Sequence, residues 1–258
     1  MAHVKYEKKG KIALIMLNRS DYNFINLEMV AELDDIWRDF QNDNEIWVGI
    51  LGSASKNFST GFDIGDFKKI FKDGKFSFAK SAAFGNKGIG PEKHSVTKPI
   101  VGAVDGFVNG LGIWLILQAD IRIATPHASF GLAEGRLNIP VEFSALMTRY
   151  MPRALINEML FTGRDISAQR FYDLGVINKI VNQEHLMEEA NKTAEEICEL
   201  GPTSVRVMKQ LVYYGYEMEY QRLIDLSNDL ASPVVNSEDA LEGINAFLEK
   251  RKPNWKMK

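Results

Sequence analysis

The sequence predicts an α/β core followed by a helical C-terminal region. Two observations lead to this prediction: strand-like and helix-like segments alternate up to about residue 180, and only helix-like segments follow. The chain of 258 residues is 45% hydrophobic, so it can bury the core of one main domain. We therefore expect a single sheet-bearing unit with a smaller helical addition.

Apolar runs rich in β-branched residues predict the strands of the core, which we expect at residues 11–18, 47–53, 99–107 and 121–126. Two helices are expected between them. The segment 26–43 is amphipathic, because its apolar residues recur at helical spacing on one side: Met29, Leu33, Ile36, Trp37 and Phe40. The segment 112–120 is almost wholly apolar and is expected to be a buried helix.

Three further helical segments are expected in the C-terminal part of the chain, at residues 184–200, 204–230 and 237–251. Two proline-containing pairs are expected to separate them, Gly201-Pro202 and Ser232-Pro233, because proline interrupts the backbone hydrogen bonds of a helix.

Composition excludes several classes of protein. The net charge is −3 with dispersed basic residues, which argues against a nucleic-acid partner or an anionic membrane surface. With the single cysteine Cys198 no disulfide can form within the chain, which suits a reducing compartment. The sequence shows no signal-peptide pattern and no apolar run long enough for a membrane span, so we expect a cytoplasmic protein.

Several catalytic motifs are missing from the sequence. It has no serine elbow and no phosphate-binding loop, and the glycines at 110–112 do not complete a dinucleotide fingerprint. The histidines lack neighbouring ligands at metal-binding spacing, so no metal site is expected.

Two glycine-containing loops are the first candidates for a functional site. Gly61 lies in a loop that follows the strand at 47–53, and Gly110 lies between the strand at 99–107 and an apolar helix. Glycine lets a ligand approach the backbone closely, and amides from two such loops could form an oxyanion hole for a carbonyl group. The alternative is that both loops are ordinary turns at strand ends.

The chain resembles the crotonase superfamily, the enoyl-CoA hydratase/isomerase family. The matching stretches follow the family order over nearly the whole chain: "FSTGFDIGDF", "KPIVGAVDGFVNGLGIWLILQADIRIAT", "ASFGLAEGRLNIP", "LFTGRDISAQRFYDLGVINKIV" and "SEDALEGINAFLEKRKPNW". The last stretch is most similar to carnitinyl-CoA dehydratase-type members. The resemblance implies a spiral of ββα units at residues 1–195. It also implies a helical region at 196–258 that assembles the chain as a trimer or a dimer of trimers.

The resemblance also implies a coenzyme A thioester substrate, with no cofactor apart from the coenzyme A of that substrate. The oxyanion amides of the family fall on Phe62 and Leu111. Asp63 is expected to cap the following turn. The segment "FLEKRKP" is similar to the one that reaches the coenzyme A phosphates, which makes Phe247 and Lys250 candidates for substrate binding.

The catalytic acids depart from the usual hydratase pattern. One of the two family glutamates falls on Glu134, but Trp114 occupies the position of the other. A single carboxylate in a dry pocket can move a proton between two carbons, so isomerisation of an enoyl-CoA double bond is the leading hypothesis.

Two alternatives remain open. The loop after Glu134 brings in Glu142, which is either a solvated loop residue or a replacement second acid. In the second case, or with an ordered water, the protein would be an atypical hydratase or hydratase-lyase. The other alternative is a non-catalytic protein that binds coenzyme A. The segment 66–95 is expected to shape the acyl pocket.

Overall fold

The computed structural model describes residues 2–70 and 89–258, so most of the segment 66–95 lies outside the described residues. The strands are β1 (Val4–Lys9), β2 (Ile12–Leu17), β3 (Val48–Ser53), β4 (Ile100–Val104), β5 (Phe107–Asn109), β6 (Ile121–Ala124), β7 (Ser129–Gly131), β8 (Ile166–Ser167) and β9 (Lys179–Ile180). The α-helices are α1 (Leu27–Asn42), α2 (Ile64–Ile70), α3 (Leu111–Leu117), α4 (Ser144–Met147), α5 (Arg153–Thr162), α6 (Ala168–Asp173), α7 (Leu186–Cys198), α8 (Pro202–Tyr214), α9 (Tyr220–Val235) and α10 (Glu238–Glu249). Short 3-10 turns are η2 (Pro91–His94), η3 (Glu134–Leu137) and η4 (Gln183–His185).

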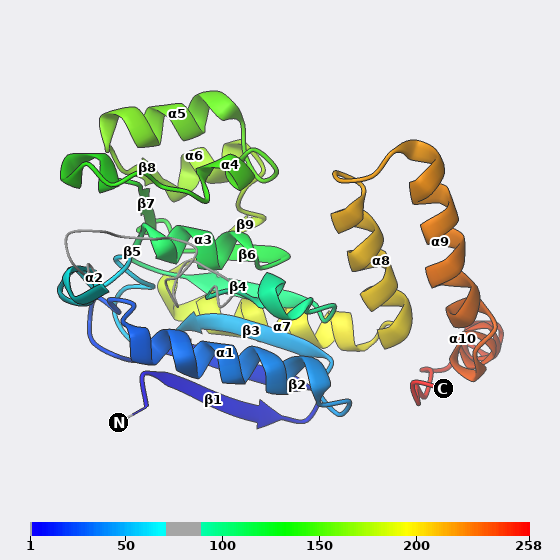
Figure 1. Cartoon of the computed structure of the whole chain (residues 1–258). Helices are drawn as coiled ribbons and strands as arrows, with labels where there is room; N and C mark the ends of the chain where they lie inside the picture. The colour runs from blue at the N-terminus through cyan, green and yellow to red at the C-terminus, as the bar shows by residue number, and fades with distance from the viewer. Residues whose placement is uncertain (1, 71–88) are drawn as a thin grey trace.

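The larger sheet forms the base of the core. Its strand order is β1-β2-β3-β4-β6-β9, and all neighbouring strands except β1 and β2 run parallel. Helices cover both faces, with α1 on one side and α7 on the other (Figure 1). The sequence of strand β3 is continuously apolar because both of its faces are buried. Leu51 belongs to the core cluster that contains α1, whereas Val48 and Ile50 belong to the cluster that contains α7.

Strand β1 was not predicted. Its sequence, VKYEKK, is mostly polar because it lies at the sheet edge with four of its six residues exposed. It pairs antiparallel with β2, from Val4 opposite Leu17 to Lys9 opposite Ile12. Edge strands of this kind carry charged side chains, and their sequences lack the apolar run that identifies buried strands.

The chain repeatedly passes from the larger sheet to a smaller one. The predicted strand 99–107 is divided, because β4 ends at Val104 and the chain turns at Gly106, with φ 64°, into β5. The smaller sheet has the order β5-β7-β8, and Ser59 extends it by a bridge to Val108. A strand of each sheet followed by a helix is the ββα unit that was predicted.

The C-terminal helices α8, α9 and α10 extend away from the sheets (Figure 1). The predicted break at Ser232-Pro233 is wrong, because α9 continues through Pro233 to Val235 and α10 begins at Glu238. The predicted helix 204–230 is in addition divided at residues 215–219, between α8 and α9. Pro233 lies in the last turn of α9, where it removes one of the last hydrogen bonds of the helix. The expected boundary between residues 195 and 196 falls inside α7, which packs on the sheet.

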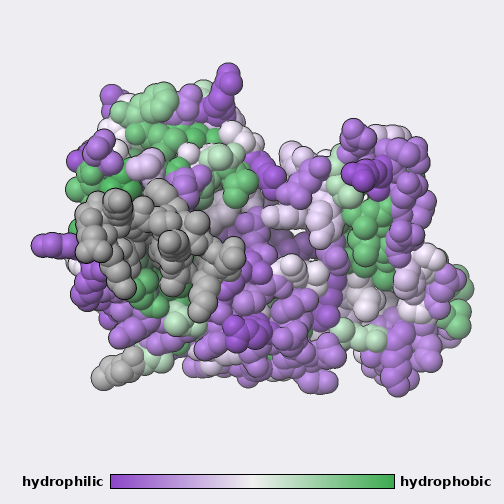
Figure 2. Space-filling view, in the orientation of Figure 1, coloured by the Kyte–Doolittle hydropathy of each residue, from purple (hydrophilic) through white to green (hydrophobic). Residues whose placement is uncertain are grey.

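The C-terminal helices leave much apolar surface uncovered. Helix α9 has no buried residue, and Figure 2 shows apolar surface over α8 and α9. Exposed large apolar side chains in this region are Met208, Val212, Tyr213, Tyr216, Tyr220, Ile224, Val235, Leu241, Ile244, Phe247 and Leu248. Across the described ranges 2–70 and 89–258, no helix is both long and apolar enough to cross a membrane.

Candidate active site

The two glycine loops meet in the structure. The chain near Ser59 pairs with β5, with the amide of Ser59 donating to Phe107 at 3.0 Å and the amide of Asn109 donating to Ser59 at 2.8 Å. Gly61 has φ 96°, and a Cβ at this position would lie 3.1 Å from the carbonyl oxygen of Asn109 and 3.5 Å from the Cα of Gly110. Glycine is therefore required here both by its backbone conformation and by the close approach of the second loop.

Backbone hydrogen bonds fix the position of Phe62. The amide of Ile25 donates to the carbonyl of Gly61 at 2.9 Å, and the amide of Asp63 donates to the carbonyl of Ile25 at 2.8 Å. The Asp63 side chain accepts hydrogen bonds from the amides of Gly65 and Asp66, at 2.9 and 3.3 Å. These contacts confirm that Asp63 caps the turn that begins α2.

Leu111 begins helix α3. Gly110 precedes it with φ 55°, and the Gly110 amide donates to the carbonyl of Gly131 at 3.1 Å. The Gly110 carbonyl accepts from the amides of Ile113 and Trp114. Within the described part of the chain, the Leu111 amide has no acceptor, as is usual for the first turn of a helix.

Glu134 lies directly against the second glycine loop. A Cβ on Gly110 would be 2.5 Å from Oε1 of Glu134 and 3.7 Å from its Cδ. The Oε2 atom of Glu134 is buried and has no hydrogen-bond partner among the residues described. Burial removes water from the ionised carboxyl, so the pKa of Glu134 is raised above the usual range of a glutamate. The carboxyl is thus a candidate acid/base beside the candidate oxyanion amides.

Glu142 follows η3 on an exposed part of the loop. Its pKa is raised, first by loss of water around the carboxyl and also by the negative charge of Glu134. Glu142 directly precedes Phe143, whose ring stacks on that of Trp114 in α3.

Trp114 forms an aromatic wall with two residues from the segment after Glu142. Its ring stacks on Phe143, with centroids 5.5 Å apart and planes at 20°, and meets Tyr150 edge-on at 6.2 Å. Trp114 is half-buried and packs against the core cluster. The Trp114 side chain therefore makes this wall apolar. Sequence reasoning had not identified Phe143 and Tyr150, which are far from Trp114 in the chain.

Phe247 and Lys250 are not brought to this site within one chain. Both belong to the end of α10, where Phe247 is 83% exposed and Lys250 has φ 53°. Helix α10 lies beyond α8 and α9 from the elements that carry Glu134 (Figure 1).

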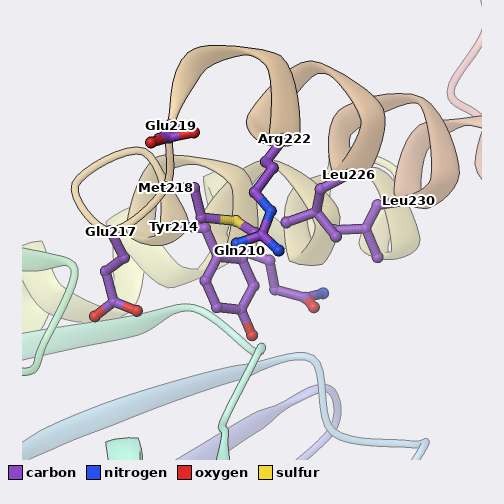
Figure 3. A pocket seen from close by; sticks show the side chains of 8 residues that line it. All are labelled: Gln210, Tyr214, Glu217, Met218, Glu219, Arg222, Leu226 and Leu230. Atoms are coloured by element: carbon purple, nitrogen blue, oxygen red, sulfur yellow. The ribbon is translucent and has the colours of Figure 1, made fainter.

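A separate groove lies between α8 and α9, with a volume of about 570 Å³. Figure 3 shows that side chains of both helices face it. Its lining residues are Gln210, Tyr214, Glu217, Met218, Glu219, Arg222, Leu226 and Leu230. It contains neither glycine loop and lacks Glu134, so it is not the candidate active site. Over the residues that the structure describes, no group of three or more His, Cys, Asp or Glu side chains could hold a metal ion.

A spiral of ββα units with two apposed glycine loops and a carboxyl against the second of them is characteristic of the crotonase class of fold. The sequence profile of the family described as enoyl-CoA hydratase/isomerase matches residues 7–258. A carnitinyl-CoA dehydratase of Citrobacter koseri is 32% identical over 97% of both chains, and one of Escherichia coli is 33% identical over 96% of both.

Solved structures agree with these sequence matches. An enoyl-CoA hydratase/isomerase from Mycobacterium paratuberculosis superposes with a TM-score of 0.89 at 29% identity, over 99% of both chains. An enoyl-CoA hydratase from Mycobacterium marinum gives 0.88 at 26% identity, again over 99% of both. The chain belongs to the enoyl-CoA hydratase/isomerase family and is an acyl-CoA enzyme.

Proposed function

We propose that the protein adds water to an enoyl-CoA or removes it from a 3-hydroxyacyl-CoA, with Glu134 and Glu142 as an acid/base pair. The observation that carries this proposal is the buried carboxyl of Glu134, which lies against the Gly110 loop with Oε2 unpartnered among the described residues. Glu142 is the proposed second carboxyl, because it directly precedes Phe143, whose ring stacks on Trp114, and Trp114 occupies the usual position of the second acid. The printed names of the relatives, carnitinyl-CoA dehydratases, support loss of water as the reaction type.

Each residue has a defined role in the dehydration direction. The thioester oxygen binds at the amides of Phe62 and Leu111. Glu134 takes the proton from Cα, and the electron pair of the broken C–H bond moves to the thioester oxygen, which gives an enolate stabilised by those amides. Protonated Glu142 gives its proton to the β-hydroxyl. The C–O bond breaks as the enolate pair forms the double bond, and water leaves.

The raised pKa values of the two carboxyls suit this division of work. A glutamate that keeps its proton nearer to neutral pH can act as an acid, and a glutamate of raised pKa is a stronger base when ionised. In the hydration direction the two residues exchange roles, as microscopic reversibility requires.

Isomerisation by Glu134 alone is the second candidate. The stack of Trp114 on Phe143 favours it, because an apolar wall offers no acceptor to hold an attacking water. Glu134 would then take a proton from one carbon and return it two carbons away. A protein that only binds coenzyme A is disfavoured, since such a protein has no use for a buried carboxyl without a partner against the Gly110 loop.

We also propose that the chain works as a trimer or a dimer of trimers, through α8, α9 and α10. The support is that large apolar side chains are exposed along all three helices and that α9 has no buried residue, since contiguous exposed apolar surface marks an interaction site. In such an assembly Phe247 and Lys250 would reach the coenzyme A of a neighbouring chain. Coenzyme A enters as part of the substrate, and we propose no further cofactor.

Labelled water distinguishes the two reactions. The purified protein is incubated with 2-enoyl-CoA and with 3-enoyl-CoA in ¹⁸O water, and the thioesters are analysed by mass spectrometry. A 3-hydroxyacyl product that carries ¹⁸O, lost in Glu134→Gln and in Glu142→Gln, is the expected result. A shifted double bond without ¹⁸O, insensitive to Glu142→Gln, would replace this proposal with isomerisation. A carnitinyl thioester is the first hydroxyacyl substrate to test in the reverse direction.

A further inference from the structure

Glu92, in the turn η2, connects parts of the chain that are distant in sequence. Its carboxylate accepts a hydrogen bond from the hydroxyl of Tyr213 on α8 and a longer one, 3.4 Å, from the hydroxyl of Tyr150. Its amide donates to Oε1 of Gln118, just after α3, at 3.2 Å. One residue thus contacts α8, the segment after α4 and the end of α3.

Two of these contacts lead to Trp114. Gln118 is buried, and its amide nitrogen donates to the carbonyl of Trp114 at 3.2 Å. Tyr150 packs its ring edge-on against the Trp114 ring. The position of Gln118 is tightly constrained, because a Cβ on Gly90 would lie 1.9 Å from its Oε1 atom. Glu92 is therefore linked to the backbone of Trp114 through Gln118 and to its ring through Tyr150.

The third contact leads to the C-terminal helices. The pKa values of Tyr150 and Tyr213 are both raised, first by burial and then by interaction with Glu92, so both hydroxyls stay protonated and act as donors. A salt bridge also joins the segment after α4 to the end of α8, because Arg149 pairs with Glu217 at 2.6 Å. Helix α8 is thus held in place even when one hydroxyl is removed.

We propose that Glu92 is a positioning residue that sets the orientation of the Trp114 wall and couples this wall to the docking of α8. The effect on acyl selectivity rests on the proposed function: Trp114 stands at the usual position of a catalytic carboxyl, which would put its ring beside the reacting carbons of the acyl group. Selectivity among acyl groups would then depend on a helix that does not itself touch the substrate. The orientation of Trp114 can be tested without any substrate.

The first test uses tryptophan fluorescence. Tyr213→Phe removes one hydroxyl, and the matched control Tyr214→Phe makes the same change at the next residue, which lines the groove between α8 and α9 and is not bonded to Glu92. We expect the emission spectrum to change in Tyr213→Phe and not in Tyr214→Phe. In a Trp114→Phe background, the change should disappear. An unchanged spectrum, or the same change in that background, would overturn the proposal.

The second test uses selectivity. The ratio of kcat/KM for a long and a short acyl-CoA is expected to change by at least about threefold in Tyr213→Phe, the lower range of coupling between contacting side chains, and to stay at the wild-type value in Tyr214→Phe. Size-exclusion chromatography checks that the oligomeric state is the same in both variants. If the kcat/KM ratio is the same in the wild type, Tyr213→Phe and Tyr214→Phe, the proposal that α8 docking affects acyl selectivity is overturned. If the wild type converts no thioester, the proposed function fails, and fluorescence alone decides the role of Glu92.

Substitutions of Glu92 itself distinguish a role in the orientation of Trp114 from a general contribution to the stability of the fold. Glu92→Gln keeps an oxygen that accepts from both tyrosines, so emission and selectivity should remain close to the wild type. Glu92→Ala should reproduce the change seen in Tyr213→Phe and add the loss of the Tyr150 contact. Identical behaviour of Glu92→Gln and Glu92→Ala would show that the acceptor oxygen is irrelevant, contrary to the proposal.

Discussion

The carboxyl of Glu134 and the α-carbon of Gly110 are in such close contact that a single methyl group at Gly110 would lie 2.5 Å from Oε1. The candidate acid/base and the candidate oxyanion loop are therefore positioned by each other. Any side chain at residue 110 must displace the carboxyl, because a Cβ and an oxygen that are not covalently bonded do not approach to 2.5 Å.

Gly110→Ala is expected to lower turnover by at least about 10²-fold, since a shift of about 1 Å in a catalytic group has an effect of this size. The backbone, with φ 55°, adds strain of about 1–3 kcal/mol to the folded state. Steady-state kinetics and thermal unfolding measure the two effects. The control is Gly175→Ala, where φ is 73° but a Cβ meets nothing within 4 Å. It should lose a similar stability and keep its activity. Equal activity loss in both variants would show that strain alone is responsible.

Glu134→Gln should make the protein more stable at neutral pH while turnover falls by about 10²–10⁴-fold. The folded state raises the pKa of Glu134, so between the ordinary and the raised pKa the folded chain binds a proton that the unfolded chain has lost. The stability of the wild type therefore falls as pH rises through this window, whereas that of the variant does not. The difference in Tm between variant and wild type is expected to grow from pH 4 to pH 8. A constant difference would contradict an ionisable buried carboxyl.

Glu142→Gln tests the electrostatic contact between the two carboxyls. The charge of Glu134 raises the pKa of Glu142, and because the repulsion is mutual, an ionised Glu142 also disfavours ionisation of Glu134. In the proposed dehydration Glu134 must be ionised and Glu142 protonated, so ionisation of Glu142 sets the basic limb of the kcat/KM profile, and Glu142→Gln should remove this limb from the small activity that remains. Glu184→Gln, in the distant turn η4, is the control. A basic limb that stays in place in Glu142→Gln would show that Glu142 is not the acid of the reaction.

The local sequence was sufficient to predict the buried elements and the glycine loops. Continuous apolar runs identified β2, β3 and β6, and helical spacing identified α1, because burial selects the residue types directly. The edge strand β1 lacked such a signal, and Pro233 gave a misleading one.

Contacts between distant segments could not be predicted in the same way. The stack of Trp114 on Phe143 and the bond from Tyr213 to Glu92 join residues whose types are common in any core or helix surface. Nothing in their sequence neighbourhood indicates a partner. The replacement of a family glutamate by Trp114 was visible from the resemblance, but the proximity of Glu142 to Glu134 required the folded loop.

Lys250→Asn tests whether the end of α10 reaches a coenzyme A phosphate. Asn removes the charge and tolerates the left-handed backbone, φ 53°, that ends this helix. We expect KM for an acyl-CoA to rise about twofold to fivefold, as for loss of one exposed ion pair, with little change in kcat. KM for the matching acyl-pantetheine, which lacks the phosphates, should not change.

Lys252→Asn is the control, because Lys252 already pairs with Glu199 at 2.8 Å. Since α10 lies away from Glu134 within one chain, the effect should also require the assembled oligomer. An equal rise in KM for acyl-pantetheine would place Lys250 outside the phosphate site.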